Sequence, residues 1–225
     1  EDKEMKSTLF NMVAVLFCIT LVASAGVGGV YQITKEPIEQ ANAQAVTEAL
    51  NQVLPAFDAK TEQELMIDEM PIVAYTATNG GDVVGYAVKT MTKKGFGGPI
   101  TLMVGFDAAG TVLNVNVLAQ TETPGLGTKM ADEGNPLIAS FQGRNPGEMT
   151  LAVKKDGGDV DALTAATISS RAYVDAMARA YNAYRQVALQ EHDADVISGA
   201  TQPVKADETT EQTGEEDARE GGNNE

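Results

Sequence analysis

The stretch with the clearest potential for chemistry is Asp161–Ser170, where a turn carrying threonine and serine hydroxyls leads into a long amphipathic segment. Unpaired backbone N–H groups and the positive end of the helix dipole make such a helix start favourable for an anion. Thr167, close to the expected first turn, could therefore hold a phosphate group. The alternative is that these hydroxyls only cap the helix, which is the usual role of Ser, Thr and Asp at this position.

Two glycine-rich segments precede the threonine stretch. Residues 95–99 read Gly-Phe-Gly-Gly-Pro, and residues 122–127 read Glu-Thr-Pro-Gly-Leu-Gly. Glycines allow a backbone to approach a flat ring or a phosphate closely. The alternatives are that the first segment simply joins two hairpins and that the second is a Pro-Gly turn at the end of a strand.

These three segments carry a family resemblance. Residues 161–170 resemble the Ser/Thr-Gly-Ala-Thr-x-Ser/Thr motif of the covalent FMN-binding domain family. The order of an apolar N-terminal helix, residues 95–99, residues 122–127 and then this motif is similar to that of the G subunits of Rnf-type ion-translocating ferredoxin:NAD oxidoreductases. The resemblance implies FMN held by a phosphoester to Thr167, made by a separate flavin transferase that uses FAD.

The resemblance also implies which neighbours contact the cofactor. Pro124, Gly125 and Leu126 would form an apolar wall for the isoalloxazine ring, and Glu122 and Thr123 would offer polar atoms to the ring or the ribityl chain. The remaining expected cofactor-binding residues are Thr164, Ala165, Ala166, Ser169, Gly127, Gly97 and Gly98.

The chain departs from the family motif at Ala165, where the family usually has glycine. A methyl group is tolerated there unless the backbone has a positive φ or lies against the cofactor. Ser198-Gly-Ala-Thr201 matches the core of the motif better, so Thr201 is a competing attachment residue. Because Thr201 is followed by Gln-Pro and an acidic stretch without apolar periodicity, the context favours Thr167.

A membrane anchor is expected at residues 9–30, since residues 7–34 carry no charge. A helix of this length spans about 33 Å, enough for a hydrocarbon layer of about 30 Å. A cleaved signal peptide is the alternative, with small residues at 23–25, but its apolar part is typically only about 7–15 residues long. Lys3 and Lys6 weakly favour a cytoplasmic tail at residues 1–8. The protein is therefore expected in the bacterial inner membrane, with its FMN domain on the extracytoplasmic side, as the resemblance also implies.

The apolar pattern after the anchor predicts an α+β fold with one antiparallel sheet and flanking helices. A helical connector is expected over residues 31–70, with a helix that starts near Pro37 and with a connector or short helix at 57–70. The FMN-binding domain should cover residues 71–190. Its expected elements are hairpins of residues 73–78 with 83–90 and of 100–106 with 111–118, a fifth strand at 150–154, and a helix at 169–189.

Composition excludes several classes of function. A chain of 225 residues holds one folded domain besides the anchor. Its formal charge of −16 lies largely in residues 191–225, which have the composition of a disordered acidic tail. Without a basic patch, nucleic acid is not expected as a partner. With only Cys18 and His192, neither a disulfide framework nor one of the usual zinc clusters is expected.

The residues contain no acid–base pair, nucleophilic triad or nucleotide loop, so the chain is not expected to have a complete active site of its own. We expect an electron-transfer protein whose covalent FMN relays electrons between the other subunits of a membrane redox complex. One alternative is the C subunit of a Na⁺-translocating NADH:quinone reductase, which shares this domain. Another is a non-redox surface-binding domain, anchored in the membrane, whose threonine motif only caps a helix.

Overall fold

The structure is a computed structural model that describes the backbone of residues 2–199 and the side chains of residues 9–190. Residues 1–189 form one compact unit. Thr201 and the rest of the acidic segment from residue 200 onward lie outside the described residues. So do the side chains of residues 1–8 and of residues 191–199, which include His192.

The fold is α+β, as expected. It contains a five-stranded antiparallel sheet in the order β1-β2-β3-β4-β5, so that each strand pairs with its neighbours in sequence. The strands are β1 (Ala59–Ile67), β2 (Met70–Asn79), β3 (Asp82–Thr92), β4 (Ile100–Phe106) and β5 (Val112–Ala119). Both predicted hairpins, β2–β3 and β4–β5, are confirmed, and the Asn79–Asp82 pair closes the first around two glycines with positive φ.

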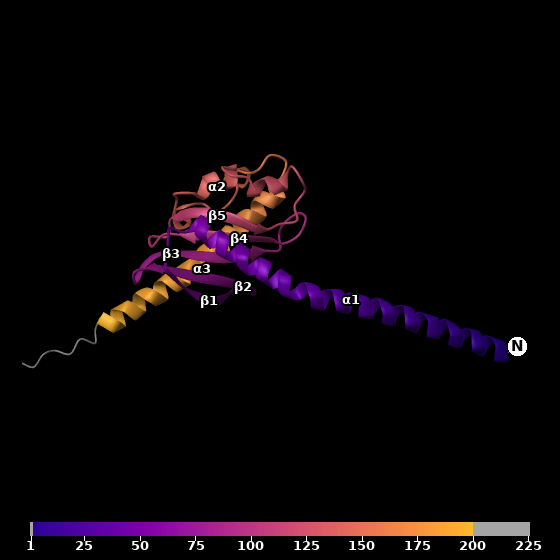
Figure 1. The fold of residues 1–225 in the computed structure, drawn as a ribbon. Coiled ribbons are helices and arrows are strands. Elements are labelled where there is room, and N and C mark those ends of the chain that lie inside the picture. Colours follow the sequence, from indigo (N-terminus) through magenta and orange to yellow (C-terminus); the bar gives the residue numbers. More distant parts are fainter. Residues whose placement is uncertain (1, 200–225) are drawn as a thin grey trace, which may run out of the picture. The chain divides into compact units, whose positions relative to one another are not determined.

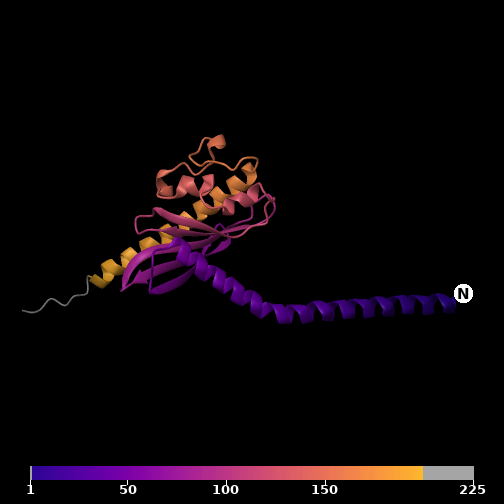
Figure 2. The same ribbon diagram turned by 45° about the horizontal axis from the view of Figure 1, so that its top comes forward.

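Two long helices cover opposite faces of this sheet (Figures 1 and 2). Helix α3 (Thr167–Gly199) packs on one face through an apolar stripe that follows the predicted spacing. The last turn of α1 (Asp2–Val53) packs on the other face through Ala49, Leu50 and Val53. Side chains of β4 alternate between the two layers, with Leu102 and Val104 toward α3 and Met103 toward α1. Both faces are thus buried, which explains why β4 reads as a continuous apolar run.

Helix α1 is continuous from Asp2 to Val53, so the prediction of a separate helix beginning near Pro37 is wrong. Pro37 lies inside the helix, where its missing N–H removes one intrahelical hydrogen bond without ending the helix. Within α1, the segment Leu9–Val53 contains a fully exposed window with a mean hydropathy of 2.3, long and apolar enough to cross a membrane.

The expectation of a connector or short helix at residues 57–70 is also wrong, since residues 59–67 form strand β1. This strand is at the edge of the sheet, and its side chains are mostly exposed, so it lacks the apolar alternation that marks a half-buried strand. Its turn to β2 uses Asp68 and Glu69, both with positive φ. Two-residue hairpin turns of this kind usually have glycine at the second position, where this chain has Glu69.

The predicted fifth strand at residues 150–154 does not form. Only Val153 makes a bridge, with Val160, and a short 3₁₀ helix η3 (Lys154–Asp156) follows it. The Asp159 carboxylate accepts a hydrogen bond of 2.6 Å from the Thr150 N–H and satisfies that group locally. Between β5 and this segment lie the 3₁₀ helices η1 (Gly127–Ala131) and η2 (Pro146–Glu148) and the short helix α2 (Pro136–Phe141).

Candidate functional site

A pocket of about 530 Å³ lies at the beginning of α3, where three segments far apart in sequence meet. Pockets that hold organic cofactors typically have volumes of about 300–1,000 Å³. The β3–β4 loop contributes Phe96, the segment after β5 contributes Thr123, Leu126 and Gly127, and the α3 start contributes residues 165–169. The fold therefore brings together the two glycine-rich segments and the threonine motif that the sequence singled out.

Thr167 is the first residue of α3 and lines this pocket. Within the part of the chain that the structure describes, its hydroxyl has no hydrogen-bond partner. The backbone N–H groups of residues 167–169 have no acceptor there either, because the first helical hydrogen bond runs from Ser170 N–H to Ala166 O. A helix start with three open donors beside a free hydroxyl favours an anion such as phosphate.

Ser170 stabilises the turn before the helix. Its hydroxyl oxygen accepts from the Leu163 N–H at 2.9 Å and donates to Ala166 O at 2.9 Å. Ser170 is fully buried, whereas Thr167 is partly exposed. The local backbone is therefore held by Ser170, and the hydroxyl of Thr167 does not act as a cap.

Glu122 connects the start of α3 to the β3–β4 loop. This side chain is buried, with only 4% of its surface exposed. One carboxylate oxygen accepts from Ser169 Oγ at 2.5 Å, and the other accepts from the Gly97 N–H at 3.1 Å. A hydrogen bond of 3.0 Å from Thr121 Oγ1 to Gly97 O adds a second tie to the same loop. Both oxygens of Glu122 are thus engaged within the protein.

The glycines around Glu122 allow these segments to approach each other. A Cβ at Gly97 would lie 1.9 Å from Thr121 O, and a Cβ at Gly127 would lie 2.7 Å from Ser169 Oγ. Contacts this short do not occur for real side chains. Alanine at Gly97 would require a backbone shift, and alanine at Gly127 would require Glu122 and Ser169 to move. At these two positions the absence of a side chain serves contact between protein segments.

Ala165 occupies a left-handed conformation, with φ of +60°. This is the position where the family motif has glycine, and the sequence expectation was that a methyl group is tolerated unless φ is positive. An L-residue in this region costs about 1–2 kcal/mol. The methyl group is exposed at the pocket and makes the turn that precedes Thr167 a strained one.

The expected cofactor-binding residues divide into two groups. The pocket is lined by Thr123, Leu126, Gly127, Ala165, Ala166, Thr167 and Ser169. The others flank or support it without lining it, namely Thr164, Glu122, Pro124, Gly125, Gly97 and Gly98. The competing Thr201 lies outside the described residues.

Two lining residues were missed by the sequence reasoning. Phe96 and Ile168 line the pocket with side chains that are 66% and 48% exposed. Together with Leu126 they give the pocket an apolar rim. A phenylalanine between glycines in a loop has no packing stripe to belong to, and that was the available signal for Phe96.

Two cations near the α3 start, Arg171 and Lys154, are paired with carboxylates. Arg171 binds both oxygens of Asp156 at 2.7 Å, and the hydrogen bond from its guanidinium holds the pKa of Asp156 below its ordinary value. Lys154 contacts Asp161 at 2.7 Å. The backbone N–H groups of residues 167–169 are open anion-binding groups at the start of α3.

Sequence comparisons match these segments to models of known protein families. The sequence model of the FMN-binding domain matches residues 95–182, which include the whole pocket, and the model of the RnfG N-terminal region matches residues 5–53. A protein of Shewanella loihica, named as the G subunit of an ion-translocating oxidoreductase complex, is 36% identical over 82% of this chain and 95% of its own length. A protein of the same name from Vibrio cholerae is 34% identical over 80% of this chain and 91% of its own length. Another, from Shewanella oneidensis, is 40% identical over 58% of this chain and 60% of its own length.

Proposed function

We propose that this chain, which belongs to the family of G subunits of ion-translocating oxidoreductase complexes, carries FMN on Thr167 and relays electrons within such a complex. The family membership makes the chain a flavoprotein subunit. The covalent bond to Thr167 and the relay of electrons through the flavin are our proposal. The observation that carries the proposal is the free hydroxyl of Thr167 beside three open backbone donors, at one end of a pocket inside the matched FMN-binding domain.

The residues of the pocket fit FMN in chemistry as well as in size. The N–H groups of residues 167–169 suit a phosphate ester, whose charge the helix dipole stabilises by about 0.3–1 kcal/mol at an exposed site. The rim of Phe96, Leu126 and Ile168 suits an aromatic ring system. Thr123 offers the pocket a side-chain hydroxyl for the polar chain between ring and phosphate.

Attachment would use the Thr167 oxygen as the nucleophile. This oxygen forms a bond to the flavin-side phosphorus of FAD, the pyrophosphate bond breaks, AMP leaves, and the hydroxyl proton passes to a base of the flavin transferase. No basic side chain contacts the Thr167 hydroxyl in the described part of the chain, which supports the proposal that a separate transferase supplies that base. The partly exposed position of Thr167 gives such an enzyme access.

Bound FMN would supply reversible electron transfer. The chain's own residues would hold and orient it: the α3 start fixes the phosphate end, while the apolar rim excludes water from the ring. Glu122 keeps the α3 start and the β3–β4 loop together through Ser169 and Gly97. A covalent tether suits a domain outside the cytoplasm, which could not readily recapture a lost flavin.

Helix α1 would anchor the domain in the bacterial inner membrane, with the pocket on the extracytoplasmic side and the other subunits of the complex as electron-transfer partners. The coupling ion would cross the membrane through other subunits of the complex, because the apolar part of α1 offers few polar groups. The hydroxyl of Thr20, one of them, already donates to Phe17 O at 2.9 Å.

In-gel flavin fluorescence tests the proposal and separates it from a non-redox, anchored domain. The full chain, coexpressed with a flavin transferase and then denatured, should fluoresce under ultraviolet light. Thr167→Val should abolish the signal, and Thr201→Val should preserve it. A colourless wild-type chain would exclude covalent flavin, and loss of the signal only in Thr201→Val would move the attachment site to the acidic segment.

A further inference from the structure

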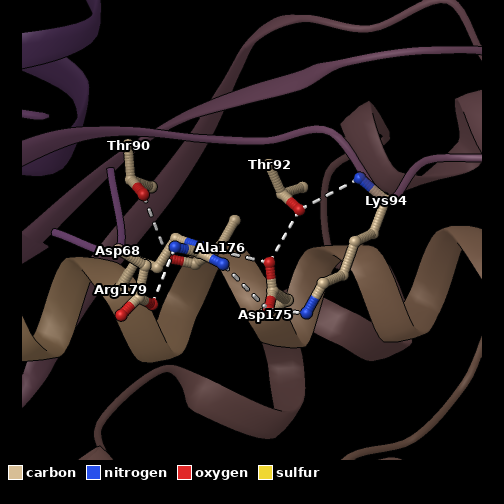
Figure 3. Close-up of polar contacts among 7 residues, drawn as sticks. All are labelled: Asp68, Thr90, Thr92, Lys94, Asp175, Ala176 and Arg179. Atoms are coloured by element: carbon tan, nitrogen blue, oxygen red, sulfur yellow. Dashed lines mark hydrogen bonds and ion pairs between the residues drawn. The ribbon is translucent and has the colours of Figure 1, made fainter. Parts of the chain in front are cut away.

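Asp175, two turns along α3 from Thr167, accepts hydrogen bonds from three side chains, which lie on β3, on the loop after β3 and on α3 (Figure 3). Thr92 Oγ1 at the end of β3 donates at 2.7 Å, and Lys94 Nζ in the following loop donates at 2.6 Å. Arg179, one turn further along α3, donates through Nε at 3.1 Å. Partial burial of Asp175 acts to raise the pKa of its carboxyl, but the hydrogen bonds from Lys94, Thr92 and Arg179 outweigh it and hold that pKa below its ordinary value.

Arg179 connects this cluster to the β1–β2 turn. Only 11% of its side chain is exposed, and it bridges Asp175 to Asp68 in the β1–β2 turn, with a distance of 2.8 Å from Nη1 to Asp68 Oδ2. Thr90 Oγ1 donates to Ala176 O at 3.2 Å and ties β3 to the same turn of α3. The end of β3 is therefore fixed to α3 directly before the β3–β4 loop begins.

The β3–β4 loop, residues 93–99, is held at two points. Lys94 binds Asp175 on one side of Phe96, and Gly97 binds Glu122 on the other. The Lys94 N–H also donates to Thr92 Oγ1 at 3.2 Å. Phe96 itself is 66% exposed, so packing contributes little to its place at the pocket.

We propose that Asp175 and Lys94 are positioning residues that hold Phe96 over the rim of the FMN pocket. This inference rests on the proposed function, because it concerns access to the same pocket. Glu122 fixes one end of the loop from behind, and the Asp175–Lys94 pair fixes the other from the α3 surface. Loss of the pair frees the Lys93–Phe96 half of the loop and leaves the hydrogen bonds to Glu122 in place.

Lys93 provides a matched control for Lys94. It carries the same charge in the same loop, is exposed, and has no ion-pair partner in the described part of the chain. Lys94→Met and Lys93→Met therefore remove equal charge, and only the former removes the tie to α3. Because the Lys94 side chain is 66% exposed, neither variant disturbs the core.

Two measurements on the full chain test the proposal. The first is amide hydrogen exchange of residues 93–96, the half of the loop that the pair holds, and it needs no flavin. Exposed ion pairs contribute little to global stability, but loss of one should raise the open fraction of the loop roughly two- to fivefold. Exchange should accelerate by this factor in Lys94→Met, stay unchanged in Lys93→Met, and return to the wild-type rate in Lys94→Arg.

The second measurement is quenching of native flavin fluorescence by acrylamide, a neutral quencher that does not respond to the lost charge. The quenching constant should rise in Lys94→Met and not in Lys93→Met. In an Asp175→Asn background, Lys94→Met should have no further effect on either measurement, which is the pattern expected if Lys94 acts through Asp175.

Equal exchange rates in the two lysine variants would overturn the proposal, as would faster exchange without any change in quenching. A chain that exchanges as expected but never acquires flavin would refute the proposed function and leave the tie between the loop and α3 established. The two failures are therefore distinguishable.

Discussion

Replacing Ala165 by glycine should stabilise the protein, although glycine usually destabilises. Ala165 has φ of +60°, and an L-residue in that conformation costs about 1–2 kcal/mol. Glycine removes this cost but loses about 0.5–1 kcal/mol in backbone entropy on folding. The methyl group is exposed, so its removal sacrifices little burial. The net gain should be about 0.5–1 kcal/mol, which corresponds to an increase in melting temperature of about 1–4 °C for a chain of this size.

Ala166 is the matched control for this prediction. It is adjacent, is only 7% exposed, and does not have a positive φ, so Ala166→Gly should lower the melting temperature through lost methyl burial and added chain entropy. The measurement is thermal unfolding of the detergent-solubilised apoprotein, followed by circular dichroism of the tyrosine bands. A decrease in melting temperature for both variants would refute the argument that the turn before Thr167 is strained.

Two further predictions concern buried and half-buried carboxylates. Glu122→Gln should destabilise the protein by about 1–3 kcal/mol, because an NH2 group, which cannot accept, replaces one of the two oxygens that accept from Ser169 and Gly97. Thermal or denaturant unfolding checks this, and an effect no larger than that of the exposed control Glu133→Gln would contradict it. The wild-type protein should have a larger free energy of unfolding than Asp175→Asn, and this difference should be full above about pH 5. It should shrink as the pH falls below about 3.9, because the folded-state pKa of Asp175 is lowered and only the ionised carboxylate contributes. Unfolding curves of both proteins between pH 3 and 7 measure this difference, and a difference that grows toward low pH would contradict the assigned direction.

The strands and helices that follow simple patterns were predictable from the sequence. The β2–β3 hairpin is marked by glycines in its turn, and α3 is marked by an apolar stripe of period 3.6 that packs on the sheet. The same reasoning missed β1, because an exposed edge strand has no face to bury and thus no pattern to detect. It also placed a helix start at Pro37, in the middle of a helix that continues through it.

The three segments of the candidate site were identified from the sequence, and the fold brings them to one pocket. The hydrogen bonds that join them could not be predicted: the Glu122 carboxylate, expected from the resemblance near the cofactor, accepts from Ser169 and Gly97. The contribution of Phe96 depends on attachments of its loop to residues 25 or more positions away, which no local pattern encodes. The positive φ of Ala165 is likewise a property of the folded turn, although the glycine of the family motif pointed to it.

Peptide mass spectrometry of the mature chain shows directly whether the Thr167 oxygen carries FMN. Trypsin releases residues 156–171, which contain Thr167, separately from residues 186–205, which contain Thr201. We expect the added mass of one FMN less one water on the first peptide, with fragmentation that places it on Thr167 and not on Thr164. An unmodified first peptide from protein matured with its transferase, or the same mass on the second, would contradict it.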